Sequence, residues 1–272
     1  MAKRALCIGI NNYPGTGSDL AGCVNDAKDW AALLKAKGFQ VTTLLDSKST
    51  LKGMRDAIEG IVSSAKSGDT IIVQYSGHGS YIPDVDGDEP DGTDECLCPY
   101  DVDRNGPLSD DELFDIYDSR VRGSKIIMIS DSCHSGSVTK FAPIVTPPTM
   151  AGRSAPQRKV RFLPPEVFLS SRDMAKLGTA RRALHRSSTP GRYASLLLAG
   201  CQDYEYSYDA YFNGRPNGAF SFVALRALKK VPSTATYRDW FKKIRAVLPS
   251  QQYPQTPNLF GSTRQRKWRA LA

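Results

Sequence analysis

The sequence predicts an α/β fold with a mostly parallel sheet covered by helices on both faces. One observation is a set of short apolar segments bounded by turn residues, which is typical of buried parallel strands. These segments are "ALCIGI" at 5–10, "VTTLL" at 41–45, "TIIVQYSG" at 70–77, "KIIMIS" at 125–130 and "YASLLLAG" at 193–200. Helical patterns separate the first three, and this alternation favours parallel pairing. The 272 residues, 40% of them hydrophobic, also suffice for a sizeable core.

Each helix is predicted from its apolar spacing and its end signals. The stretch at 19–38 closes on Gly38, and the stretch at 49–68 begins at Ser49 or Thr50 as N-cap and ends at Gly68. Two more helix-like stretches follow the last strand, "GAFSFVALRALKK" at 218–230 and "TYRDWFKKIRAVL" at 236–248. The chain therefore has a further strand and two further helices after residue 192.

The net charge of +8 belongs to one segment. Residues 141–192 hold ten Lys/Arg against two Asp/Glu, together with seven of the 17 prolines, so the rest of the chain is neutral. This composition predicts a mobile linker or large loop. We expect one domain in three parts: residues 1–140, the linker at 141–192 and a smaller part at 193–272.

Several features bear on compartment and partners. Six scattered cysteines without a zinc-like spacing predict free thiols rather than disulfides or a structural zinc. Every apolar run is far shorter than a membrane span, and "MAKRALCIGI" resembles a first strand rather than a secretory leader. We therefore expect a cytoplasmic protein with no membrane partner.

Two strand ends carry reactive side chains. His78 follows the strand at 70–77 in "YSGHGS", and Cys133 follows the strand at 125–130 in "DSCHSG". Parallel sheets bind and react at the carboxyl ends of their strands, and a thiol needs a base to become a nucleophile. His134 is a poorer partner for Cys133, because adjacent residues of an extended segment face opposite sides. A lone buried cysteine or histidine is usually structural, but two such groups at neighbouring strand ends favour a Cys/His hydrolase.

The motifs "YSGHGS" and "DSCHSGS", with "GCVNDA" and "SDDEL", resemble the caspase-like cysteine peptidases, and metacaspases and orthocaspases most closely. The resemblance covers most of the chain. It implies a caspase-like fold with a single, mostly parallel six-stranded sheet. It also implies a dyad of His78 and Cys133, with the backbone amides of Gly79 and Cys133 as the oxyanion hole. This chemistry needs no cofactor.

The resemblance further implies cleavage of proteins and peptides after Arg or Lys. Asp26 and Asp131 would form the acidic pocket, lined by Cys23 and Ser76. The physics agrees, because two carboxylates in a partly desolvated pocket favour a guanidinium. On sequence alone, Asp26 could equally be a solvated helix residue.

The same resemblance gives the basic linker a function as the enzyme's own first substrate. Relatives are often made as zymogens that cut themselves after Arg or Lys in this region. The candidate positions between 150 and 192 are Arg153, Arg158, Lys159, Arg161 and Arg172. The alternative is a solvated surface loop that happens to be basic.

Calcium activation is a further expectation from the resemblance. The family's calcium site maps to Asp94, Asp110 and Asp111, but Lys140 stands where another carboxylate is expected, which weakens the site. The acidic loop at 84–95 has alternating carboxylates, yet Glu89 replaces the glycine that an EF-hand requires.

Other functions are open on sequence alone. A catalytically idle caspase-like scaffold is one alternative. Nucleic-acid binding through the basic segment is another, which we do not expect, because that segment has few aromatic residues and no binding module. The tyrosines at 204, 206, 208 and 211, with Asp203 and Asp209, line the substrate groove or form a packed surface loop. We expect a monomer.

Overall fold

A six-stranded sheet forms the centre of the computed structural model, which describes residues 1–84, 92–133, 158–180, 194–202 and 205–272, the side chains of 176–180 excepted. The strand order is β12-β9-β7-β3-β1-β2, and all neighbouring pairs are parallel except β12 with β9. The strands are β1 (Lys3–Gly9), β2 (Gln40–Leu45), β3 (Thr70–Ser76), β7 (Lys125–Asp131), β9 (Leu196–Ala199) and β12 (Asn258–Phe260).

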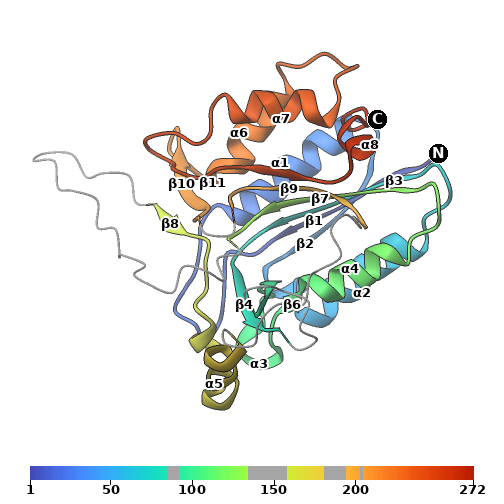
Figure 1. Cartoon of the computed structure of the whole chain (residues 1–272). Coiled ribbons are helices and arrows are strands. Elements are labelled where there is room, and N and C mark those ends of the chain that lie inside the picture. The colour runs from blue at the N-terminus through green and yellow to red at the C-terminus, as the bar shows by residue number, and fades with distance from the viewer. Residues whose placement is uncertain (85–91, 134–157, 181–193, 203–204) are drawn as a thin grey trace, which may run out of the picture.

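Helices cover both faces of this sheet (Figure 1). One face carries α1 (Cys23–Ala36), α6 (Ala219–Leu228) and α7 (Tyr237–Arg245); the other carries α2 (Leu51–Ser63) and α4 (Asp110–Asp118). The shorter helices are η1 (Asp46–Lys48), α3 (Val102–Asn105), η2 (Pro165–Val167), α5 (Ser171–Ala180) and α8 (Thr263–Arg266).

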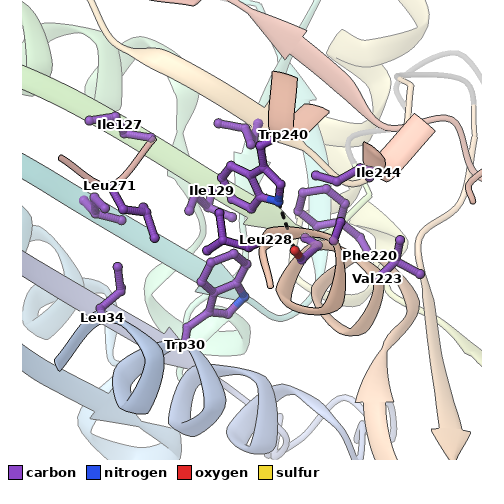
Figure 2. Packing of buried hydrophobic residues seen from close by; sticks show 14 of the residues in the cluster. Trp30, Leu34, Ile127, Ile129, Phe220, Val223, Leu228, Trp240, Ile244 and Leu271 are labelled. Carbon is purple, nitrogen blue, oxygen red and sulfur yellow. Dashed lines mark hydrogen bonds between the residues drawn. The ribbon is translucent and has the colours of Figure 1, made fainter. Parts of the chain in front are cut away.

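The sheet separates two apolar cores. In β1, Ala5 and Cys7 belong to the core under α1, α6 and α7, whereas Leu6 and Ile8 belong to the core under α2 and α4. This alternation follows from the two-residue period of a strand. Trp30 of α1 meets Trp240 of α7 edge to face, with ring centroids 6.0 Å apart (Figure 2). The side chains of both cores are buried and closely packed. This packing on each face of the sheet fixes the positions of the strand ends.

Two small sheets lie beside the carboxyl ends of the central strands. One has the order β11-β10-β8 and the other the order β4-β5-β6. Their strands are β8 (Lys159–Val160), β10 (Tyr208–Phe212), β11 (Arg215–Gly218), β4 (Gly79–Pro83), β5 (Thr93–Leu97) and β6 (Leu108–Ser109). The described part of the predicted linker, residues 158–180, is thus folded: β8 pairs with β10, and Arg161 and Leu163 are fully buried. This basic segment is ordered because Arg161 forms buried ion pairs and Leu163 packs in an apolar core.

The predicted fold class is confirmed, and so are its parallel strands and four main helices. Thr50, rather than Ser49, caps α2 by accepting a hydrogen bond from the Gly53 amide. The sixth strand, β12, was not predicted from its residues, because three residues are too few for a periodic signal. All six cysteines are buried and free. Among the described residues, the helices are all too short or too polar to cross a bilayer.

Candidate active site

Strand register brings the two predicted reactive residues to the same edge of the sheet. β3 and β7 pair in parallel with Ser76 opposite Asp131, so His78 and Cys133 both lie two residues beyond that pair. Both side chains are buried. The Gly79 backbone, which starts β4, packs so closely that a methyl group on it would overlap the Cys133 carbonyl. Only glycine fits at this position, which explains why the histidine is followed by one.

The His78 ring is held in one tautomer. Its Nε2 lies 2.6 Å from the Ser18 carbonyl oxygen, which can only accept, so Nε2 carries the proton. The buried Nδ1 has no hydrogen-bond partner among the described residues and is free to take up a proton. Burial lowers the pKa of His78 to about 4, against opposing interactions with the Ser18 carbonyl and the Arg161 backbone. The ring is therefore neutral at pH 7, as a general base must be.

Hydrogen-bond partners also fix the Cys133 sulfur. The Ser207 amide donates to Sγ at 2.8 Å, and the Ser207 carbonyl lies 3.5 Å from the same sulfur. A hydrogen bond with Cys133 and burial raise the pKa of a second thiol, Cys201, whose Sγ also donates to the Ser132 carbonyl at 3.4 Å. The nucleophile candidate is thus surrounded by the turn that leads into β10 and by a neighbouring thiol.

A carbonyl from the linker occupies the predicted oxyanion position. The Arg161 carbonyl oxygen accepts hydrogen bonds from the Gly79 amide at 3.0 Å and from the Cys133 amide at 3.2 Å. Two backbone donors converging on one carbonyl oxygen form the arrangement that stabilises a tetrahedral intermediate. The peptide bond between Arg161 and Phe162 therefore lies where a scissile bond would lie.

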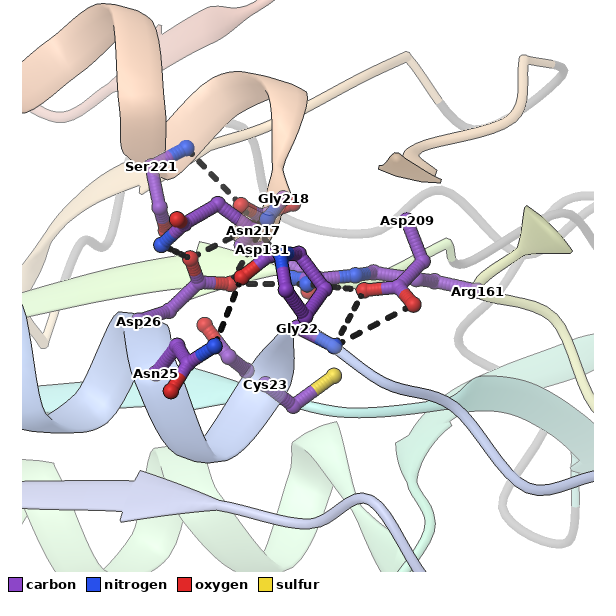
Figure 3. Close-up of polar contacts among 12 residues, drawn as sticks. Gly22, Cys23, Asn25, Asp26, Asp131, Arg161, Asp209, Asn217, Gly218 and Ser221 are labelled. Carbon is purple, nitrogen blue, oxygen red and sulfur yellow. Dashed lines mark hydrogen bonds and ion pairs between the residues drawn. The ribbon is translucent and has the colours of Figure 1, made fainter. Parts of the chain in front are cut away.

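The Arg161 side chain enters the acidic pocket that the sequence predicted, and it is fully buried there (Figure 3). Its Nη2 lies 2.7 Å from Asp26 and 2.9 Å from Asp209, and its Nη1 lies 3.2 Å from Asp131. Nη1 also donates to the Asp131 carbonyl at 3.0 Å. Three carboxylates from three separate segments thus surround one guanidinium.

The carboxylates are themselves held by backbone and side-chain donors. Asp26 accepts from the Gly218 amide at 3.0 Å and from Asn217 at 2.8 Å. Asp131 accepts from the Ser221 amide at 2.8 Å and from the Ser207 hydroxyl at 2.6 Å. Such donors let negative charge persist in a dry site.

Asp209 is anchored separately. It accepts hydrogen bonds from the Ala21 amide at 2.8 Å and the Gly22 amide at 3.0 Å. A side chain at Gly218 would collide with Asp131 and Arg161, so the wall of the pocket must be backbone there.

The other two predicted pocket residues are both buried. Cys23 is the first residue of α1, and burial raises its pKa well above the usual range despite the opposing charge of Arg161. Ser76 ends β3 and accepts a hydrogen bond from Gln74 at 2.8 Å. Burial raises the pKa of Asp26 to about 7, with Arg161 lowering it and Asp131 raising it. One acid of the pocket therefore titrates near neutrality.

The segment before Arg161 lies along β10 as an added strand. Val160 pairs with Tyr208, Lys159 pairs with Asp209, and the Arg161 amide donates to the Ser207 carbonyl at 2.9 Å. Antiparallel strand addition is a recurrent way for a protein to bind an extended peptide. Lys159 also donates to the Asp19 carbonyl at 2.7 Å, and the Arg158 guanidinium lies 5.0 Å from the centre of the Tyr208 ring.

The remaining predicted processing positions differ from Arg161. Arg158 and Lys159 lie outside the acidic pocket, and Arg172 is exposed on α5. Arg153 and His134 lie outside the described residues, as does Lys140. Of the candidates that the structure describes, Arg161 is therefore the one whose side chain and carbonyl both lie in the site.

The predicted calcium ligands come from two elements that are close in the fold. Asp94 is on β5, and Asp110 and Asp111 start α4, which follows β6 next to β5. Within the described ranges, no three His, Cys, Asp or Glu side chains are grouped so that they could hold a metal ion. Much of the acidic loop, residues 85–91, is outside those ranges, so calcium activation stays a prediction.

Sequence reasoning named Asp209 only as part of a run that lines the substrate groove or forms a packed surface loop, and it did not assign Ser207. Asp209 is remote in sequence from the strand ends and reaches the pocket through the β10–β8 pairing. A usable signal was the run "YEYSYDAY" at 204–211, which begins four residues after the strand at 193–200 ends. The groove interpretation of this run fits Tyr206 and Tyr208, which contact Phe162 and Arg158, whereas Tyr211 is exposed.

Comparison with known proteins agrees with this architecture. The caspase domain model, Peptidase_C14, matches residues 2–268. Metacaspase-1 from Mycosarcoma maydis is 30% identical over 285 aligned residues, covering 96% of this chain and 70% of that protein. Metacaspase-7 from Arabidopsis thaliana is 43% identical over 148 residues, covering 51% of this chain and 36% of that protein. This chain thus spans about a third of the plant relative's length.

A solved structure extends the likeness to three dimensions. The crystal structure of protein GSU0716 from Geobacter sulfurreducens is 31% identical, with a TM-score of 0.75, covering 100% of this chain and 99% of that one. The family model and the full-length structural likeness both span the dyad candidates and the small-subunit-like part. The chain belongs to the caspase-domain family, Peptidase_C14, and its relatives within that family include metacaspases.

Proposed function

We propose that the chain is a cysteine endopeptidase that cleaves after Arg or Lys and that first cuts itself after Arg161. One observation carries the proposal: the Arg161 carbonyl accepts two amide hydrogen bonds beside Cys133 while the Arg161 guanidinium is held by three aspartates. The carbonyl of this one residue is placed for nucleophilic attack, and its side chain is placed for recognition by the acidic pocket. Arg161 thus lies in the site as a substrate residue would lie in a peptidase before cleavage.

The reaction follows from this geometry. The Cys133 sulfur attacks the Arg161 carbonyl carbon, and its proton passes to the free Nδ1 of His78. The Gly79 and Cys133 amides stabilise the oxyanion, since both already donate to this oxygen. His78 then gives the proton to the nitrogen of Phe162, so that the carbon–nitrogen bond breaks and a thioester forms between Cys133 and Arg161. Water hydrolyses the thioester, releasing the Arg161 carboxylate and the free thiol.

Arginine is expected to be preferred over lysine. The three carboxylates contact two different nitrogens of the guanidinium, and a lysine has a single nitrogen that cannot reach both positions. Acidic side chains would place a fourth negative charge in a buried pocket, which is strongly unfavourable.

Hydrolysis of peptide reporters tests the proposal. Purified protein is expected to cleave reporters with Arg before the scissile bond, those with Lys more slowly, and those with Asp or Leu not measurably. Cys133→Ala should cleave none of them, and on a gel it should stay a single chain. The matched control is Cys7→Ala, a buried cysteine of β1 in the core.

Two results would contradict the proposal. Equal fragmentation of Cys133→Ala and wild type would exclude self-cleavage. A folded wild-type protein that cleaves no arginyl reporter would favour the alternative of a catalytically idle scaffold.

A further inference from the structure

The residue after Arg161 contacts two aromatic rings. The Phe162 ring is stacked on Tyr81 of β4, with centroids 6.0 Å apart and 18° between the planes. It also meets Tyr206, with centroids 6.2 Å apart and a tilt of 52°. Tyr81 is itself largely buried. Two remote segments therefore supply an aromatic clamp on the leaving-group side of the proposed scissile bond.

The next residue, Leu163, is fully buried and belongs to the apolar core on the α2 and α4 side of the sheet. Its backbone is fixed as well: its amide donates to the Gly79 carbonyl at 3.0 Å, and its carbonyl accepts from the Ser80 hydroxyl at 2.6 Å. Gly79 thus holds the carbonyl of Arg161 with its amide and the amide of Leu163 with its carbonyl. One residue sets the chain register on both sides of the bond.

We propose that this enzyme also selects its substrates beyond the scissile bond, taking an aromatic residue directly after the cut and a large aliphatic residue next. The inference rests on the proposed cleavage after arginine and adds a second specificity site to it. Tyr81 and Tyr206 recognise the aromatic ring by offset and tilted stacking, which rewards a ring over a methyl group. The site of Leu163 is buried, so a large aliphatic side chain there gains binding free energy by removing apolar surface from water.

A tethered segment could pack in this way simply because it is part of the fold. Untethered peptides remove that explanation, since they must bind through their own contacts. The test therefore uses three peptides that share Arg-Lys-Val-Arg, the sequence of residues 158–161. They continue with Phe-Leu, Ala-Leu or Phe-Ala, and they are mixed in one tube so that relative kcat/KM values follow from product ratios by mass spectrometry.

Three enzymes are compared, each as the full chain in the form in which it purifies: wild type, Tyr81→Ala and the control Tyr211→Ala. Tyr211 is an exposed tyrosine of β10. Wild type is expected to prefer Phe-Leu to Ala-Leu roughly tenfold, and to prefer Phe-Leu to Phe-Ala by at least roughly tenfold. Tyr81→Ala should reduce the first ratio to roughly threefold, because one of two stacking partners is gone. It should leave the second ratio unchanged.

The ratios separate a subsite from a structural effect, because a partly unfolded variant lowers all three rates equally. If wild type cuts the three peptides after Arg at equal rates, the leaving-group site is wrong while arginine specificity stands. If the Phe/Ala ratio in Tyr81→Ala equals that of wild type, Tyr81 does not form the site and the inference fails. If wild type cuts none of the peptides, the proposed function fails and this inference falls with it.

Discussion

At the scale of single residues, the site depends on three buried carboxylates that share one buried guanidinium. Asp26, Asp131 and Asp209 would repel one another without a cation, and Arg161 provides it within the chain. Breaking a buried ion pair by removing one partner typically costs about 3–5 kcal/mol. The structure therefore gains from seating Arg161, and under the proposed function the same three carboxylates would bind a substrate arginine after Arg161 leaves.

The pH dependence of self-cleavage follows from Asp26. Its pKa is raised to about 7, so the carboxyl becomes neutral as the pH falls through 7 and holds Arg161 less tightly. The self-cleavage rate should rise with pH up to about 8. His78, with a pKa of about 4, stays neutral throughout this range and adds no inflection above pH 5. The measurement is the rate at which freshly translated chain splits, followed on gels between pH 5 and 8.

The matched variant for this profile is Asp26→Asn, which keeps the shape and removes the titration. Its rate should be lower than that of wild type by roughly 10- to 100-fold at pH 8, because one charge-assisted hydrogen bond is weakened. Its profile should lose the inflection near pH 7. An unchanged inflection in this variant would assign the titration to another group.

At the scale of elements, helix ends contribute stability apart from the chemistry. Thr236 and Asp239 form a capping box at the start of α7, in which the Thr236 side chain accepts from the Asp239 amide. This helix buries Trp240 and Ile244 against the sheet, so its N-terminus should matter for the whole domain. Removal of such a cap costs about 1 kcal/mol.

Thr236→Ala is therefore expected to lower Tm by about 2–4 °C while leaving reporter hydrolysis unchanged. Thr236→Ser should restore most of the loss, since serine caps by the same hydroxyl. The exposed neighbour Thr234 provides the control, and Thr234→Ala should leave Tm as it is. Thermal unfolding followed by circular dichroism measures all three, and an equal Tm for Thr236→Ala and wild type would contradict a stabilising cap.

At the scale of the whole molecule, the parts predictable from sequence are those whose signal is local. The strands at 5–10, 70–77 and 125–130 carry apolar runs, and His78 and Cys133 follow two of them within three residues. Parallel pairing then brings their ends together without any further information. The family resemblance added Asp26 to this set.

The rest depends on tertiary packing. Asp209 and the buried place of Arg161 result from pairing between β8 and β10, two short strands with no periodic pattern of their own. The fold of residues 158–180 within the predicted linker was not visible for the same reason, because composition does not reveal which buried partners a basic residue will find. Composition did identify the segment, and the structure singled out Arg161 within it.

The central claim is that the bond between Arg161 and Phe162 is the one the enzyme cuts in itself. Intact-mass and N-terminal analysis of the purified wild-type chain should show a fragment that begins at Phe162. Arg161→Gln should abolish this cut, Arg161→Lys should retain it at a lower rate, and the control Arg158→Gln should be cut as wild type is. A first cut after another basic residue, or an unchanged fragment from Arg161→Gln, would contradict the account.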